Sequence, residues 1–119
     1  MERRNIQVYE YLCHIGEAKD WLETCIEEEI APIDKIEQSL RDGVIIAKIA
    51  RIYEPSSVKK IFQDPRIQYR HSDNINYFLD AIRKIGLPEN FHFELTDLYA
   101  KKNLPKVIYC IHALGYLLK

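Results

Sequence analysis

Two short stretches of this 119-residue sequence combine cysteine with histidine, the side chains that most often bind zinc in proteins. His14 follows Cys13 directly, and His112 lies two residues after Cys110. Neither pair has the CxxC or HxxxH spacing of a structural zinc site. With Cys25 the cysteines number three, and the first residues show no signal-peptide pattern that would indicate an oxidising compartment. We therefore predict no metal site, and we expect the cysteines to be reduced and buried or half-buried.

The sequence also lacks the residue patterns that carry out catalysis. It contains no glycine-rich phosphate loop and no GxSxG, HExxH or CxxC motif. The acidic run at residues 27–29 has neither the spaced ligands nor the turn glycine of a calcium-binding loop. No motif places a nucleophile beside a base. We therefore predict that the protein is not an enzyme and needs no cofactor.

Charge is distributed in blocks, although the formal net charge is only −1. Residues 17–37 hold eight acids and two bases, whereas residues 38–71 hold seven bases and three acids. After Asp97 the chain contains four lysines and no acid. Each block alone is best explained as the solvated face of a helix, but the two basic blocks would form one surface if the fold joined them. The near-neutral total argues against nucleic acid as the partner.

Hydrophobic spacing predicts four main helices that would position these charges. Apolar residues recur at helical intervals over residues 12–28, 44–53 and 72–86, and again after Asn103. The Ile-rich segment 44–53 could also form a strand, but it stands between helical signals, so we interpret it as a buried helix. These segments predict an all-α fold.

Capping residues predict several helix ends. Ser72 is expected to be the N-cap of the third main helix, which Gly86 followed by Pro88 would end. Asn103 is expected to cap the last helix, with Pro105 in its first turn. Each of these residues is therefore assigned a local structural role.

Shorter elements are expected between the main helices. Asp34 is a plausible N-cap for a short helix that ends before Gly43, and a short turn or helix is expected around residues 96–101. Residues 54–71 contain two prolines and no sustained period, so they predict a long connection, pinned by Ile61 and Phe62.

The length fits one domain, for which we expect residues 11–119 to form the folded unit and residues 1–10 an N-terminal extension. No apolar run approaches the ~20 residues of a membrane-spanning helix. We therefore expect a cytoplasmic domain that does not interact with membranes and that is monomeric in isolation.

Four motifs in this order resemble the calponin-homology family over nearly the whole chain. They are "AKDWL" at 18–22, "LRDGV" at 40–44, "DNINYFLDAIRKIGLP" at 73–88 and "KNLP" at 102–105. Two further strings, "YRHSDN" at 69–74 and "IYCIHAL" at 108–114, are similar to the single N-terminal domain of IQGAP scaffold proteins. The sequence resembles in particular a fungal IQGAP-like cytokinesis protein.

The resemblance implies a compact all-α calponin-homology fold of about four main helices plus short connecting helices. It also implies F-actin binding and a place in contractile-ring or cortical actin assembly. Because actin filaments are acidic, we expect a basic surface to make the contact. The candidate residues are Lys101, Lys102, Lys106, Lys59, Lys60, Arg66, Arg70, Arg3 and Arg4.

Two other binding functions remain open on the sequence. The first is an adaptor domain that binds calmodulin or another regulatory protein, because the last helix is basic and amphipathic. Burial of the apolar face of that helix in the core would prevent this binding. The second is a microtubule-binding domain, which the basic connection would suit equally well.

Overall fold

The computed structural model describes residues 3–118, without the side chains of residues 3–6, Pro65 and Tyr69. The described chain is all-α, which confirms the predicted fold class. Its four long helices are α1 (Arg3–Ile26), α3 (Val44–Tyr53), α4 (His71–Ile85) and α6 (Leu104–Leu117). Two shorter helices are α2 (Ile36–Leu40) and α5 (Leu95–Tyr99). Four 3-10 segments complete the chain: η1 (Ile33–Lys35), η2 (Pro55–Ser57), η3 (Pro65–Arg70) and η4 (Glu89–Phe91).

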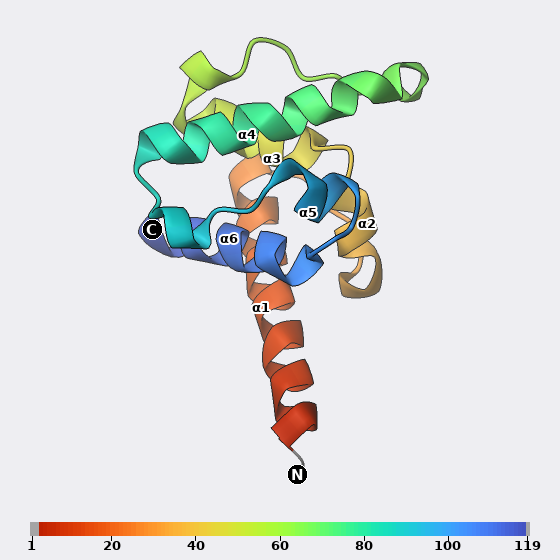
Figure 1. Ribbon diagram of the computed structural model, residues 1–119, viewed down its shortest axis with the longest axis vertical. Coiled ribbons are helices and arrows are strands. Elements are labelled where there is room, and N and C mark those ends of the chain that lie inside the picture. The colour runs from red at the N-terminus through yellow and green to blue at the C-terminus, as the bar shows by residue number, and fades with distance from the viewer. Residues whose placement is uncertain (1–2, 119) are drawn as a thin grey trace.

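The helices pack in two principal pairs, α3 against α4 and α1 against α6. Figure 1 shows α4 across one end of the molecule with α3 behind it, and α6 crossing α1 in the middle. The first turns of α1 project beyond the body of the domain (Figure 1). None of the described helices has the length and apolar character needed to cross a membrane.

One hydrophobic core joins the two pairs of helices. Leu22 of α1, Ile49 of α3, Phe78 of α4 and Ile111 of α6 are each no more than 1% exposed. The Phe78 ring stacks on Phe93 with 5.9 Å between the ring centroids. Burial of such a side chain stabilises the fold by about 1.5–3 kcal/mol, so this core fixes the helix positions on which any surface site depends.

Two of the predicted helix ends are confirmed. α4 ends at Gly86, whose left-handed backbone (φ 98°) suits a residue without a Cβ atom. The Asn103 side chain accepts a hydrogen bond from the Lys106 N–H (3.3 Å), so it caps α6 as expected. Both signals are local in sequence, because each acts within a single turn of its own helix.

The expected start of the first helix was wrong. α1 begins at Arg3, so residues 3–10, expected as an extension, continue the helix. Val8 and Tyr9 are 54% and 66% exposed. Residues 7–10 are all exposed, so this described part of α1 buries no apolar stripe, and hydrophobic spacing gave no helical signal there.

Two expected N-caps were also wrong. Asp34 lies inside η1 rather than before a helix, and its side chain caps neither η1 nor α2. Ser72 lies inside the first turn of α4, because η3 leads directly into that helix. Residues 54–71 do form the expected connection between α3 and α4, and within it lie η2 and η3, which are too short to produce a hydrophobic period.

Candidate interaction surface

The predicted lysines Lys101 and Lys102 lie in the turn that joins α5 to α6, and both side chains are exposed. Backbone hydrogen bonds fix this turn. The Lys101 N–H donates to the Leu98 carbonyl oxygen (3.2 Å), and the Lys102 N–H donates to that of Thr96 (3.3 Å). Lys101 has a left-handed backbone with a φ of 57°. The turn therefore presents two neighbouring cations on a well-defined backbone.

Lys106 follows in the first turn of α6 and is partly neutralised. Its Nζ lies 3.9 Å from Oδ2 of Asp97. The same Asp97 oxygen accepts a hydrogen bond from the Glu94 N–H (2.8 Å) at the start of α5. Among the described residues no carboxylate forms an ion pair with Lys101 or Lys102. These two lysines therefore offer more net positive charge to a partner than Lys106 does.

Arg41 joins this turn, although the sequence analysis did not include it in the site. Its Nε donates to the Tyr99 carbonyl oxygen (2.8 Å), and its guanidinium carbon lies 4.9 Å from the centroid of the Tyr99 ring. Arg41 and Lys101 line a depression of about 260 Å³, together with Gln68 and His71. Arg41 belongs to the "LRDGV" motif, which served as a helix-end signal and as a family motif but did not indicate this contact. We call Arg41, Tyr99 and Lys101 the Tyr99 cluster.

The long connection is held to α4 by the buried side chain of Asn74, which is 0% exposed. Its Oδ1 accepts from the Phe62 N–H (2.9 Å), and its Nδ2 donates to the Phe62 carbonyl oxygen (2.8 Å). The same Nδ2 also lies 2.9 Å from the carbonyl oxygen of Asp42. Because Asp42 follows Arg41, one side chain ties the connection to the turn that carries Arg41.

Two predicted cations gather on the ring of Phe62. Nζ of Lys60 lies 5.8 Å from the ring centroid, and the guanidinium carbon of Arg70 lies 5.2 Å from it. Arg70 also forms an ion pair with Asp73 (3.0 Å). We call Lys60, Phe62 and Arg70 the Phe62 cluster. Gln68 and His71, which flank Arg70 in the sequence, line the depression that holds Arg41.

The remaining predicted cations contribute less to this surface. Arg66 pairs with Asp64 at 2.8 Å, and this guanidinium holds the pKa of the Asp64 carboxyl below its usual range. Lys59 is exposed beside the Phe62 cluster. Arg3 and Arg4 lie outside the residues whose side chains are described. The two basic blocks of the sequence thus meet at the depression that Arg41 and Lys101 line.

A groove of about 800 Å³ lies beside Lys101, between α1, α2 and the start of α6. Leu12 and Ile33, which are 47% and 43% exposed, contribute apolar surface to it. The Tyr11 hydroxyl donates to Oε1 of Glu37 (2.8 Å) across the groove. Burial and this hydrogen bond raise the pKa of the Tyr11 phenol well above its usual range. An apolar surface therefore lies next to the turn that carries Lys101 and Lys102.

The cysteines divide between core and surface. Burial raises the pKa of the Cys110 thiol to about 12, and Cys25 is half-buried with its Sγ 3.4 Å from the Tyr53 hydroxyl. Cys13, however, is exposed on α1, contrary to the prediction. Helical spacing places Cys13 opposite the buried stripe of Ile15, Ala18 and Leu22, which is why it faces solvent.

Two known proteins are similar to this chain over nearly its whole length. The chain is 56% identical over 117 residues to the Ras GTPase-activating-like protein rng2 of Schizosaccharomyces pombe. It is 47% identical over 126 residues to the human Ras GTPase-activating-like protein IQGAP3. Each alignment covers 98% of this chain and 8% of the relative, so the chain spans about a twelfth of the length of these proteins.

A solved structure and a family model match nearly the whole chain. The crystal structure of the calponin-homology domain of Rng2 from Schizosaccharomyces pombe superposes with a TM-score of 0.89 at 56% identity. The superposition covers 98% of this chain and 73% of that one. The family model described as the calponin homology (CH) domain matches residues 12–119. The chain therefore belongs to the calponin-homology family and is a domain of the IQGAP type.

Proposed function

We propose that this chain is the F-actin-binding module of a larger cytoskeletal scaffold protein, and that it binds through the Tyr99 and Phe62 clusters. Membership of the calponin-homology family supports actin as the partner. The observation that carries the proposal is that cations distant in sequence gather at two places: Arg41 and Lys101 at one depression, and Lys60 and Arg70 on the Phe62 ring. The module is a binding domain rather than an enzyme.

The backbone of Lys101 supports a role for its side chain. A left-handed conformation costs roughly 1–2 kcal/mol for a residue with a Cβ atom and almost nothing for glycine. Lys101 adopts it at an exposed turn where its side chain forms no ion pair with a described residue. The backbone strain at residue 101 is therefore not offset by an ion pair of the Lys101 side chain within the domain. Such strain is expected at a position whose side chain contacts a partner.

Cytokinesis is the process that we propose for the whole protein, because the sequence resembles fungal IQGAP-like cytokinesis proteins. The chain would then act in the cytoplasm, at the contractile ring or the actin cortex. The chain spans 8% of the length of these relatives, so this proposal for the whole protein extends beyond the domain described.

Co-sedimentation with F-actin at low and moderate salt tests the proposal. We expect Lys101→Glu/Lys102→Glu to weaken binding at least about tenfold, because two attractions become two repulsions. Wild-type binding should also weaken as salt screens the surface. Lys59→Glu/Lys60→Glu tests the Phe62 cluster in the same way. Circular dichroism establishes beforehand that each variant folds.

A matched control is Arg83→Glu/Lys84→Glu, which changes the formal charge by the same amount. Arg83 lies about 18 Å along α4 from His71, given the 1.5 Å rise per residue. This control should pellet like wild type. If wild type stays in the supernatant even at low salt, direct actin binding is wrong. Equal loss in the control and the Lys101/Lys102 variant would show that total charge, rather than this surface, decides binding.

Arg41→Ala should affect both binding and stability. Loss of one exposed cation is expected to weaken actin binding about two- to fivefold. Loss of the contact with the Tyr99 ring and carbonyl oxygen should lower the free energy of unfolding by about 1 kcal/mol. Urea unfolding and co-sedimentation measure the two effects. Arg51→Ala, at an exposed position of α3, is the control, and an equal response there would remove Arg41 from the site.

The adaptor function is the alternative if actin does not bind. Calmodulin captures apolar faces of basic helices, but the apolar face of α6 is buried in the core through Val107, Ile111 and Leu114. Calmodulin would therefore have to contact residues that remain exposed, such as Tyr109 and Tyr116. A calcium-dependent pull-down with calmodulin, and co-sedimentation with microtubules, distinguish these partners from actin.

A further inference from the structure

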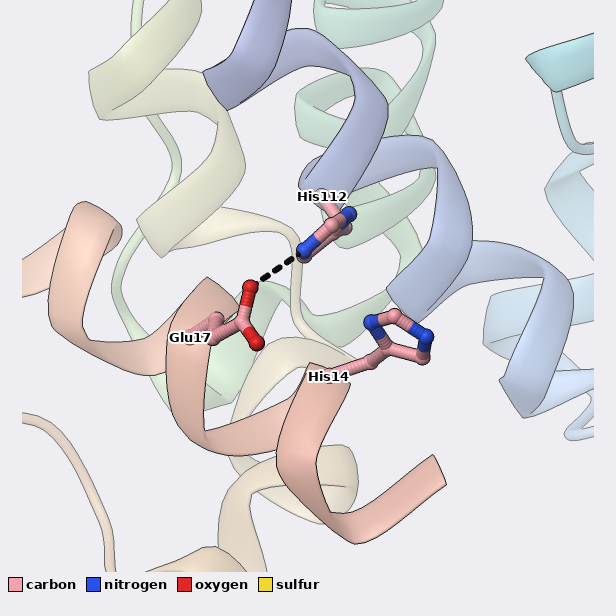
Figure 2. A group of neighbouring side chains, drawn as sticks. All are labelled: His14, Glu17 and His112. Carbon is pink, nitrogen blue, oxygen red and sulfur yellow. Dashed lines mark hydrogen bonds and ion pairs between the residues drawn. The ribbon is translucent and has the colours of Figure 1, made fainter. Parts of the chain in front are cut away.

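A polar group of three side chains lies within the α1–α6 interface. His14 and Glu17 are one turn apart on the same face of α1, and His112 reaches them from α6 (Figure 2). Nε2 of His112 lies 2.7 Å from Oε2 of Glu17. The His14 and His112 rings meet edge to face, with 4.6 Å between their centroids. One nitrogen or oxygen atom of each residue lies within 4.8 Å of the other two.

His14 has a buried nitrogen that the protein does not satisfy. Its Nδ1 is inaccessible to solvent and has no hydrogen-bond partner among the described residues. Most buried polar side-chain atoms have a partner, and an exception calls for an explanation such as an ion or a water molecule. The ion pair of His112 with Glu17 explains those two residues but leaves His14 unexplained. A ligand shared by all three side chains explains the whole group.

We propose that His14, Glu17 and His112 bind one divalent transition-metal ion of the zinc type between α1 and α6. Imidazole nitrogen and carboxylate oxygen are ligands that zinc accepts, whereas magnesium prefers oxygen and water alone. Metal–ligand bonds of roughly 2.0–2.2 Å in a tetrahedron place the ligand atoms about 3.3–3.6 Å apart. The observed separations, from 2.7 to at most 4.8 Å, bracket that value.

The surroundings leave room for the fourth ligand that three protein ligands require. A pocket of about 110 Å³ adjoins Glu17 and His112, and Trp21 and Gly115 also line it. This space accommodates a metal-bound water molecule, whose share of liquid volume is about 30 Å³. On the other side, the Tyr109 ring meets the His14 ring at 5.4 Å between centroids. The site therefore has one closed side and one side open to solvent.

Zinc binding would connect the first and last long helices of the domain. The chain lacks zinc-site spacing because His14 and His112 are 98 positions apart and meet only through the packing of α1 on α6. A bound ion stabilises only the folded form, in which the three ligands are together. The inference is independent of actin binding, since the site lies outside the Tyr99 and Phe62 clusters.

Titration of the 119-residue chain with ZnCl₂ tests the proposal, with calorimetry for stoichiometry and thermal unfolding for stability. The exposed Cys13 adjoins His14, so the titration uses a Cys13→Ser background to exclude thiolate binding. We expect one zinc per chain and a higher unfolding temperature, with no shift from MgCl₂. Co²⁺, which reports tetrahedral coordination by its visible absorption, should bind in the same ratio.

His14→Phe and His112→Ala should each lower zinc affinity at least about 100-fold, more than the 10–100-fold loss usual for residues that only support a ligand. His14→Phe preserves the aromatic contact with Tyr109, so it separates metal binding from packing. His92→Ala is the control, because Nε2 of His92 is hydrogen-bonded to the Leu87 carbonyl oxygen (2.6 Å) and His92 is not a member of the three-residue group. The proposal is overturned if zinc does not bind one to one, or if binding survives in His14→Phe and His112→Ala.

Discussion

Replacement of Gly43 with alanine is expected to lower the free energy of unfolding by about 2–5 kcal/mol. Gly43 precedes α3 with a φ of 75°, and an added Cβ would lie 2.8 Å from Cβ of Asn74 and 2.9 Å from the backbone nitrogen of Ile75. Left-handed strain contributes roughly 1–2 kcal/mol and forced repacking a further 1–3 kcal/mol. Because the second obstacle is backbone of α4, rotation of a side chain cannot relieve it.

Gly86→Ala is the matched control for this substitution. Gly86 has a similar left-handed backbone, with a φ of 98°, but an added Cβ would have no neighbour within 4 Å. Its loss should therefore be the strain alone, roughly 1–2 kcal/mol. Urea unfolding of the two variants isolates the contribution of the close approach of α3 and α4. If both variants lose the same stability, that close approach does not restrict residue 43.

The main helices could be predicted from the sequence because their signals act within one or two turns. The hydrophobic period of α4 and the Gly86 that ends it are local, and so is the Asn103 cap of α6. The prediction of Asp34 as an N-cap failed because a local preference does not by itself decide where a helix starts. An aspartate favours an N-cap, but the 3-10 turn of η1 includes Asp34, and the helix after it begins without a side-chain cap.

The candidate surface was predictable only in part. That Lys101 and Lys102 are exposed follows from a polar turn between two helices, which the sequence shows. Arg41 lies 58 positions from Tyr99, and its contact depends on the packing of α2 beside α5. The meeting of His14 with His112 likewise depends on the crossing of α1 and α6. Such long-range contacts have no signature in the spacing of one sequence. The sequence therefore shows which residues are charged but not how the fold arranges them.

Asn74→Ala is expected to lower the free energy of unfolding by about 2–4 kcal/mol. The substitution removes three hydrogen bonds and leaves the Phe62 N–H and the carbonyl oxygens of Phe62 and Asp42 without their buried partner. An unsatisfied buried group costs about 1–3 kcal/mol, although the freed connection can move to meet water. Urea unfolding measures the loss of stability.

The same substitution should loosen the Phe62 cluster before the whole domain unfolds. Hydrogen exchange at the Phe62 amide is therefore expected to accelerate more than exchange in the core of α6, because only the first loses its acceptor. Asn76→Ala, two residues along α4 at an exposed position, should change stability by less than about 0.5 kcal/mol. Unchanged exchange at Phe62 in Asn74→Ala would show that other contacts hold the connection. If exchange at Phe62 accelerates and actin binding weakens together, actin binding by this part of the surface depends on how the Phe62 ring positions Lys60 and Arg70.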